Sequence, residues 1–98
     1  MIIVIGSVFA KHDSLEELLD LSLEHVRRSR KEPGCLSHAV HQDAENPLRL
    51  VFVEEWADRA SLEEHFRVTA SQAFVRAARA LATERETINS YDVNLLQF

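Results

Sequence analysis

The sequence predicts an α+β fold of the ferredoxin-like type, with the order β-α-β-β-α-β and two helical regions on one face of a four-stranded antiparallel sheet. Two observations carry this prediction. Four segments rich in β-branched and other apolar residues alternate with two segments of helical periodicity. The two middle strand segments are separated only by a short polar turn, so they form a hairpin, and right-handed crossovers place the first and last strands in the same sheet.

The first half of the chain contains a strand and a helix. Residues 2–10 (IIVIGSVFA) form the strand, because β-branched residues dominate them. The helix begins at Ser14, which together with Glu17 matches a capping box. It ends near Lys31, because the Pro-Gly pair at 33–34 cannot continue it. One face of this helix is apolar or small, with Leu15, Leu18, Leu19, Ser22 and Val26.

The second half contains the hairpin, a helical region and a last strand. Residues 35–42 and 48–56 are the hairpin strands, joined by the turn DAENP. Asp58 or Ser61 caps the helical region, which bends or restarts between residues 69 and 71. Its apolar stripe consists of Phe66, Phe74, Ala77, Ala78 and Leu81. Residues 88–98 are the expected last strand.

The strands predict a partner subunit. In the first strand, Ile3 and Ile5 occupy one face, while Val4 and Val8 occupy the other. Strands that are apolar on both faces are buried on both faces. Because the helices cover only one face of the sheet, we expect the other face to pack against the same sheet of a second copy, giving a dimeric α+β barrel.

The composition and the net charge limit which partners and which cellular compartment are expected. The 98 residues make one domain spanning residues 1–98, and the net charge of -5 disfavours nucleic acid and anionic membrane surfaces. The apolar run at the N-terminus is too short for a bilayer span and lacks the basic flank of a signal peptide. Cys35 is the only cysteine, so no intrachain disulfide forms, and a reducing cytoplasm is the expected location.

Glu54 is the first candidate for chemistry. It alternates with Phe52 and Trp56 on one face of the third strand, which carries it toward a covered face. There the carboxylate must be hydrogen-bonded, paired or protonated, and a raised pKa would suit it to proton transfer. The alternative is a position at the sheet edge or dimer rim, paired with an arginine. Trp56 is either a packing residue or a wall of a pocket.

Histidines are the second group of candidates. His65 lies beside Phe66 in the second helical region, and His25 lies at the edge of the first helix's apolar face. Because both helices cover one sheet face, the two imidazoles can face a common cavity, where they would exchange protons near pH 7. Each could instead be a structural histidine that borders the core.

No motif predicts a cofactor. His38 and His41 are three residues apart on a strand and point to opposite faces, so they cannot share one ion. The chain has no HExxH, CxxC, phosphate-binding glycine loop or dinucleotide fingerprint. We therefore expect no metal, flavin or nicotinamide. An enzyme built on this chain would act on a small apolar or aromatic molecule, with His, Glu and Tyr91 as its polar groups.

Three stretches carry a family resemblance: SRKEPGCL (29–36), LVFVEEWADRASLEEHF (50–66) and QAFVRAARAL (72–81). They resemble antibiotic biosynthesis monooxygenase domains, and the likeness runs from the first strand to the last. This resemblance implies a homodimer with one cavity per subunit. It also implies oxidation of phenols, anthrones or quinols by O₂ without metal, flavin or haem.

The resemblance also implies site residues. Glu54, Trp56 and His65 match residues that recur in the family, and His25 and His38 lie where cavity walls are expected. Two departures stand out. Ala70 occupies the place where many members carry a second histidine. The chain also lacks the asparagine, tryptophan and later histidine of the haem-degrading branch, so haem degradation is not expected.

Three functions follow as hypotheses. In the first, a cofactor-independent monooxygenase oxidises a small aromatic or quinol, and His65, helped by His25 or Glu54, removes the substrate proton. The ring is then held by Trp56, His38, Phe52, Phe66, Phe74 and Tyr91. In the second, the same cavity shuttles protons in an isomerase. In the third, the protein is a dimeric ligand-binding module without catalysis.

Overall fold

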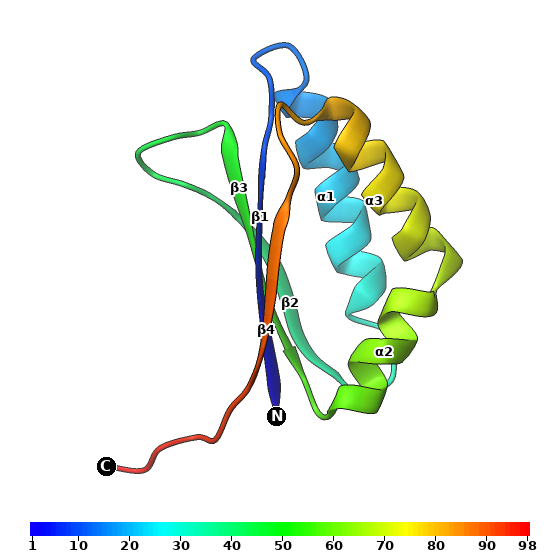
Figure 1. Cartoon of the computed structure of the whole chain (residues 1–98), viewed down its shortest axis with the longest axis vertical. Helices are drawn as coiled ribbons and strands as arrows, with labels where there is room; N and C mark the ends of the chain where they lie inside the picture. The colour runs from blue at the N-terminus through cyan, green and yellow to red at the C-terminus, as the bar shows by residue number, and fades with distance from the viewer.

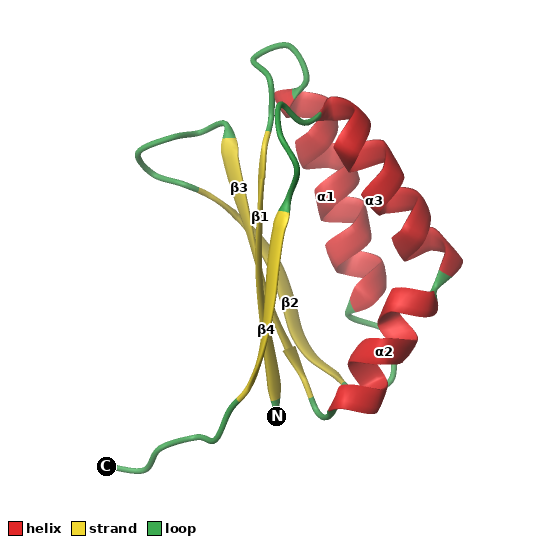
Figure 2. Cartoon of the chain, viewed as in Figure 1, coloured by secondary structure: helices red, strands yellow, loops and turns green.

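The computed structural model describes residues 1–98 and contains four strands and three helices. The elements in chain order are β1 (Ile2–Phe9), α1 (Leu15–Ser29), β2 (Cys35–Gln42), β3 (Arg49–Trp56), α2 (Arg59–Arg67), α3 (Thr69–Leu81) and β4 (Thr87–Asp92). The strand order is β2-β3-β1-β4, and every neighbouring pair is antiparallel. All three helices lie on one face of this sheet (Figures 1 and 2). The ferredoxin-like prediction is confirmed.

The core lies between the sheet and the helices. Burial alternates along β3, where Leu50, Phe52, Glu54 and Trp56 are buried. The buried positions of β1 beside them include Val4, because it pairs with Glu54 in the register. The predicted grouping of Glu54 with the apolar side of its strand is therefore correct, and this carboxylate faces the helices.

The ends of the helices differ in part from prediction. Ser14 does not cap α1, because its hydroxyl donates to the carbonyl oxygen of Leu81 at 2.7 Å. Asp58 caps α2 as expected, accepting the Ser61 backbone N–H at 2.8 Å. The predicted restart is present and slightly earlier, because the extended backbone of Val68 separates α2 from α3.

The last strand is shorter than the predicted 88–98. Its final pair with β1 joins Asp92 to Ile2, the first residue of that strand, and one more hydrogen bond, from the Val93 backbone N–H to the Met1 carbonyl oxygen at 2.9 Å, follows before the pairing stops. Residues 93–98 instead lead away from the sheet on the side opposite the helices (Figure 1). Leu95, Leu96 and Phe98 in this tail are exposed. No helix combines the length and the apolar composition needed to cross a bilayer.

Candidate functional site

A cavity of about 360 Å³ lies between the sheet and the helices. Its wall is mainly apolar and comes from β1, β3, β4, α2 and α3, with one residue of α1. Six of the predicted site residues line it, namely His25, His65, Glu54, Phe52, Phe66 and Phe74. The polar members among these six, two imidazoles and one carboxylate, all belong to the set expected to perform proton transfer.

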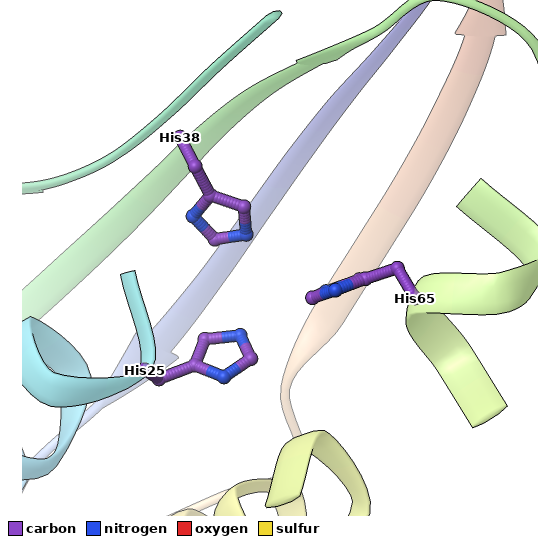
Figure 3. Close-up of side chains that lie close together, drawn as sticks. All are labelled: His25, His38 and His65. Carbon is purple, nitrogen blue, oxygen red and sulfur yellow. The ribbon is translucent and has the colours of Figure 1, made fainter. Parts of the chain in front are cut away.

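Three buried histidines from three elements meet beside this cavity. His25 comes from α1, His38 from β2 and His65 from α2, and their rings surround a common space (Figure 3). The ring centroids are 5.3, 5.4 and 5.5 Å apart. One nitrogen from each ring lies within 4.8 Å of the other two. The rings are in contact, and their nitrogens lie close enough to act on one shared species.

Local structure explains how each ring arrives there. His25 is one turn beyond the buried Ser22 on the inner face of α1. His38 is paired across the sheet with Glu54, so both side chains leave the sheet on its helical face. His65 is one turn beyond the buried Leu62, on the short helix that follows β3. Folding therefore assembles the cluster from positions up to 40 residues apart.

Glu54 lies close to Trp56 and to two histidines of the cluster. Its Oε1 accepts the Trp56 indole N–H at 2.9 Å and lies 3.2 Å from His38 Nε2 and 4.0 Å from His65 Nε2. Burial raises the pKa of Glu54, but His38 and the indole N–H outweigh it, so the pKa lies below its ordinary value. The raised pKa considered from the sequence is wrong, and so is the alternative of an arginine partner at an edge.

Glu32 fixes the orientation of His65. Glu32 Oε1 lies 2.9 Å from His65 Nδ1, in the loop between α1 and β2. A carboxylate only accepts hydrogen bonds, so the ring donates from Nδ1. In the neutral ring Nε2 is then bare, and it is the nitrogen that faces Glu54 and the cluster. His65 therefore presents a lone pair that can accept a proton.

Arg28 makes Nε2 of His25 a hydrogen-bond donor, whereas Nε2 of His65 is an acceptor. The guanidinium Nη2 lies 2.7 Å from His25 Nδ1, and because arginine only donates, Nδ1 must accept. Burial, followed by the nearby His38, His65 and Arg28, lowers the pKa of His25 to about 3. The ring is therefore neutral at pH 7 and carries its proton on Nε2. His25 thus offers an N–H donor, whereas His65 offers an acceptor.

Three residues predicted to hold substrate do not line the cavity. Trp56 is fully buried behind it, where its ring packs on His65 with centroids 4.7 Å apart. His38 is also fully buried and contacts the other two imidazoles from the sheet side. Tyr91 pairs with Ile3, so it lies on the open face of the sheet and is 49% exposed. The prediction for Tyr91 is wrong, because the register of β4 was not visible in the sequence.

Two positioning residues were missed by the sequence analysis. The sequence analysis assigned no role in the site to Glu32 or Arg28, which lie near the end of α1. The spacing between Arg28 and His25, three residues on a helix, is a signal that could have identified that pair. Glu32 lies 33 residues before His65, and no local pattern links them.

The fold and the site define the class: a small ferredoxin-like α+β protein with a mainly apolar cavity lined in part by buried histidines. The antibiotic biosynthesis monooxygenase family model matches residues 1–77. Since this match covers more than half of the chain, the protein belongs to the antibiotic biosynthesis monooxygenase family.

Similar proteins agree with this assignment. The chain is 32% identical to an antibiotic biosynthesis monooxygenase of known structure, with a TM-score of 0.89 over 97% of this chain and 100% of that one. A conserved protein from Methanosarcina mazei Go1 is 29% identical, with a TM-score of 0.88 over 92% of this chain and 89% of that one. An uncharacterized protein of Synechocystis sp. is 33% identical over 92 residues, which is 94% of this chain but only 63% of the relative's length.

Proposed function

We propose that this protein is a monooxygenase that oxidises a small phenol or quinol with O₂ and needs no cofactor for this reaction. One observation carries the proposal. The cavity wall is mainly apolar and includes two imidazoles of opposite polarity, His65 with a bare Nε2 and His25 with an Nε2–H. Family membership supports monooxygenase chemistry, and the residues above supply the roles.

The first step is removal of a proton. His65 Nε2 accepts it from the substrate hydroxyl, and Glu32 stabilises the imidazolium that forms. The His25 Nε2–H donates to the phenolate oxygen, so the anion is stabilised inside a largely apolar cavity. Phe74, stacked on the His25 ring at 4.2 Å, provides an aromatic surface for the substrate ring.

The second step is electron transfer to O₂. The quinol anion supplies all four electrons that O₂ takes up, because its ring is oxidised to the quinone and one ring C–H becomes C–OH, so no external reductant is needed. One oxygen atom forms a bond to the substrate carbon, and the other leaves as water with the two hydrogens that the quinol loses. Glu54 has a lowered pKa and is a weak base, so it positions Trp56 through the indole N–H and takes no substrate proton.

Oxygen uptake tests this proposal. We expect one or more members of a panel of hydroquinones and anthrones to be consumed with O₂ by metal-free, chelator-treated protein. His65→Asn should lower kcat by about 10²- to 10⁴-fold, as loss of a general base does. His41→Asn is the matched control, because His41 is an exposed histidine outside the cluster. Uptake that is absent for the whole panel, or that survives His65→Asn, would contradict the assignment.

A proton-shuttling isomerase is the second candidate, and a specific observation favours it. An acceptor on His65 and a donor on His25 face one cavity, which is also the arrangement needed to remove a proton at one atom and return it at another. Turnover under strictly anaerobic conditions would support the isomerase and exclude the oxygenase.

A non-catalytic binding module would instead give thermal stabilisation by ligands without any chemical change by mass spectrometry.

We also propose that the open face of the sheet pairs with a second copy of the chain. This face carries Ile3, Ile5, Val51, Val53 and Tyr91, none of which is covered by a helix. The exposed apolar tail leaves the sheet on the same side (Figure 1). A monomer at micromolar concentration in light scattering would refute the dimer.

The free, half-buried Cys35 supports a reducing compartment, the cytoplasm.

A further inference from the structure

We propose that the histidine cluster is a binding site for one divalent transition-metal ion, with His38, His65 and Glu54 as the primary ligands. The proposal is independent of the oxygenase proposal, because it concerns binding that can be measured without turnover. Its basis is the arrangement of donor atoms, the unpartnered state of His38 and the contacts that hold the other two ligands.

The donor atoms have the spacing of a metal site. Imidazole nitrogens and carboxylate oxygens bind zinc-like ions at about 2.0–2.2 Å, so two ligand atoms of one ion lie roughly 3–4 Å apart. Glu54 Oε1 is 3.2 Å from His38 Nε2 and 4.0 Å from His65 Nε2. The first distance lies within this range, and the second lies at its upper end. The three ligands come from β2, β3 and α2, so the sheet and a helix fix them together.

His38 is a buried polar side chain without a satisfied partner. Its exposure is 1%, and neither ring nitrogen makes a hydrogen bond of good geometry, even though Nε2 lies close to Glu54. Buried polar groups in native proteins are nearly always paired, so a partner is expected. A metal ion between His38 and Glu54 would satisfy the ring and place its positive charge against the carboxylate.

The two other ligands are held as metal ligands usually are. His65 donates from Nδ1 to Glu32, which leaves Nε2 bare and directed at the site, the carboxylate–histidine–metal arrangement. Glu54 accepts the Trp56 N–H at 2.9 Å, which fixes its carboxylate. These outer contacts exist before any ion arrives, so binding requires little reorganisation.

His25 is the third histidine of the cluster and would be the fourth donor, but Arg28 keeps it from binding. The guanidinium donates to Nδ1, so the proton sits on Nε2, where a metal would otherwise bind. Coordination by His25 requires the proton to move to Nδ1, which Arg28 opposes at 2.7 Å. Arg28→Met should therefore release His25 as a fourth ligand and tighten metal binding by about tenfold or more, since contacts around the ligands change affinity about 10- to 100-fold.

The donor set selects the class of ion. Two imidazoles and one carboxylate suit Zn²⁺, Co²⁺, Ni²⁺, Cu²⁺ or Fe²⁺, whereas Ca²⁺ and Mg²⁺ prefer oxygen ligands alone. Because an ion would occupy His65 Nε2, it would also remove the base of the proposed oxygenase. We therefore expect bound metal to inhibit O₂ uptake by the metal-free protein.

Titration of the tag-free, chelator-treated chain with Co²⁺ tests the site. We expect one ion per chain by calorimetry, with the visible absorption bands of a low-coordinate cobalt ion. His38→Asn and Glu54→Gln should each weaken binding by more than about 100-fold, and Glu32→Gln by about 10- to 100-fold. His41→Asn, on the same strand as His38 but exposed, should bind like the wild type.

A measurement on the wild type keeps the test valid if a variant fails to fold. Paramagnetic Co²⁺ should shift or broaden the NMR signals of the His38 and His65 rings and leave those of His12 and His41 in place. No binding, binding that survives His38→Asn, or effects confined to His12 and His41 would overturn the site. An unchanged or weaker affinity in Arg28→Met would overturn the role given to His25. The oxygenase proposal is tested separately, by O₂ uptake of the metal-free protein.

Discussion

Gly34 lies in the loop between α1 and β2, and its backbone packs against the start of α2. Replacing it with alanine should destabilise the protein. Its φ is +81°, in the left-handed region, and its carbonyl oxygen accepts the Ala57 backbone N–H at 2.8 Å. A Cβ at this position would lie 2.0 Å from Ser61 Oγ and 2.5 Å from Ser61 Cβ. Rotation of the serine side chain moves Oγ but leaves Cβ in place, so the backbone itself must shift.

Two costs add in Gly34→Ala. A non-glycine residue in the left-handed region costs about 1–2 kcal/mol, and an overpacked contact costs about 1–3 kcal/mol. We therefore expect the free energy of unfolding to fall by about 2–5 kcal/mol in total. Glu32 lies two residues before this position, so the displaced loop should also weaken the Glu32–His65 contact and reduce activity.

Urea unfolding followed by Trp56 fluorescence measures this loss, because Trp56 is the only tryptophan and is fully buried. Ser61→Gly provides the second arm of a double-mutant cycle. Without the serine side chain, the nearest atom to the new Cβ is the Cα of residue 61 at 3.8 Å, an ordinary contact. In that background Gly34→Ala should cost only about 1–2 kcal/mol. A loss below about 0.5 kcal/mol in the wild-type background, or no coupling between the two sites, would refute this reasoning.

Three further predictions concern other parts of the molecule. Trp56→Phe removes the N–H donor to buried Glu54 and should cost about 1–3 kcal/mol by urea unfolding followed by circular dichroism; an unchanged midpoint would show that this hydrogen bond contributes nothing. The hydrogen bond from Arg79 lowers the pKa of Glu86, so this pair stabilises the fold above the ordinary pKa of 4.5 and the stabilisation is lost as the pH falls below that value. Glu86→Gln should therefore be less stable than the wild type at neutral pH, and the difference in stability should become smaller in acid. An equal difference at both pH values would contradict this. Deleting residues 94–98 should leave the unfolding midpoint of the subunit nearly unchanged but weaken self-association in light scattering, and an equally tight dimer would exclude the tail from the interface.

The face of each central strand could be predicted from the sequence, because side chains alternate with a period of two. That period placed Glu54 with Phe52 and Trp56 on the covered face, and the structure agrees. The order of elements followed for a similar reason, since the polar turn and the two helical stretches leave few ways to connect four strands. These features depend on local pattern alone.

Long-range partners account for most of what the sequence analysis missed. Ser14 bonds to Leu81 in place of capping its own helix, and no spacing near Ser14 reveals that partner. Tyr91 was assigned to the cavity without knowledge of its pair Ile3, and that pairing alone decides its face. The meeting of His38 with His25 and His65 is of the same kind. The search for short metal motifs excluded pairs close in sequence and could not address residues brought together by folding.

The break at Val68 divides the second helical region into α2, which carries the proposed base, and α3, which lines the cavity. His65, the proposed base, lies on α2, which begins after its cap Asp58 and ends before Val68. Phe74 and Ala78, which also line the cavity, lie on α3. Substitutions on α3 can therefore reshape the space for a substrate while the proton acceptor keeps its place. Descendants of one ancestral protein could diverge in what they bind by changing α3, and retain one chemistry through α2.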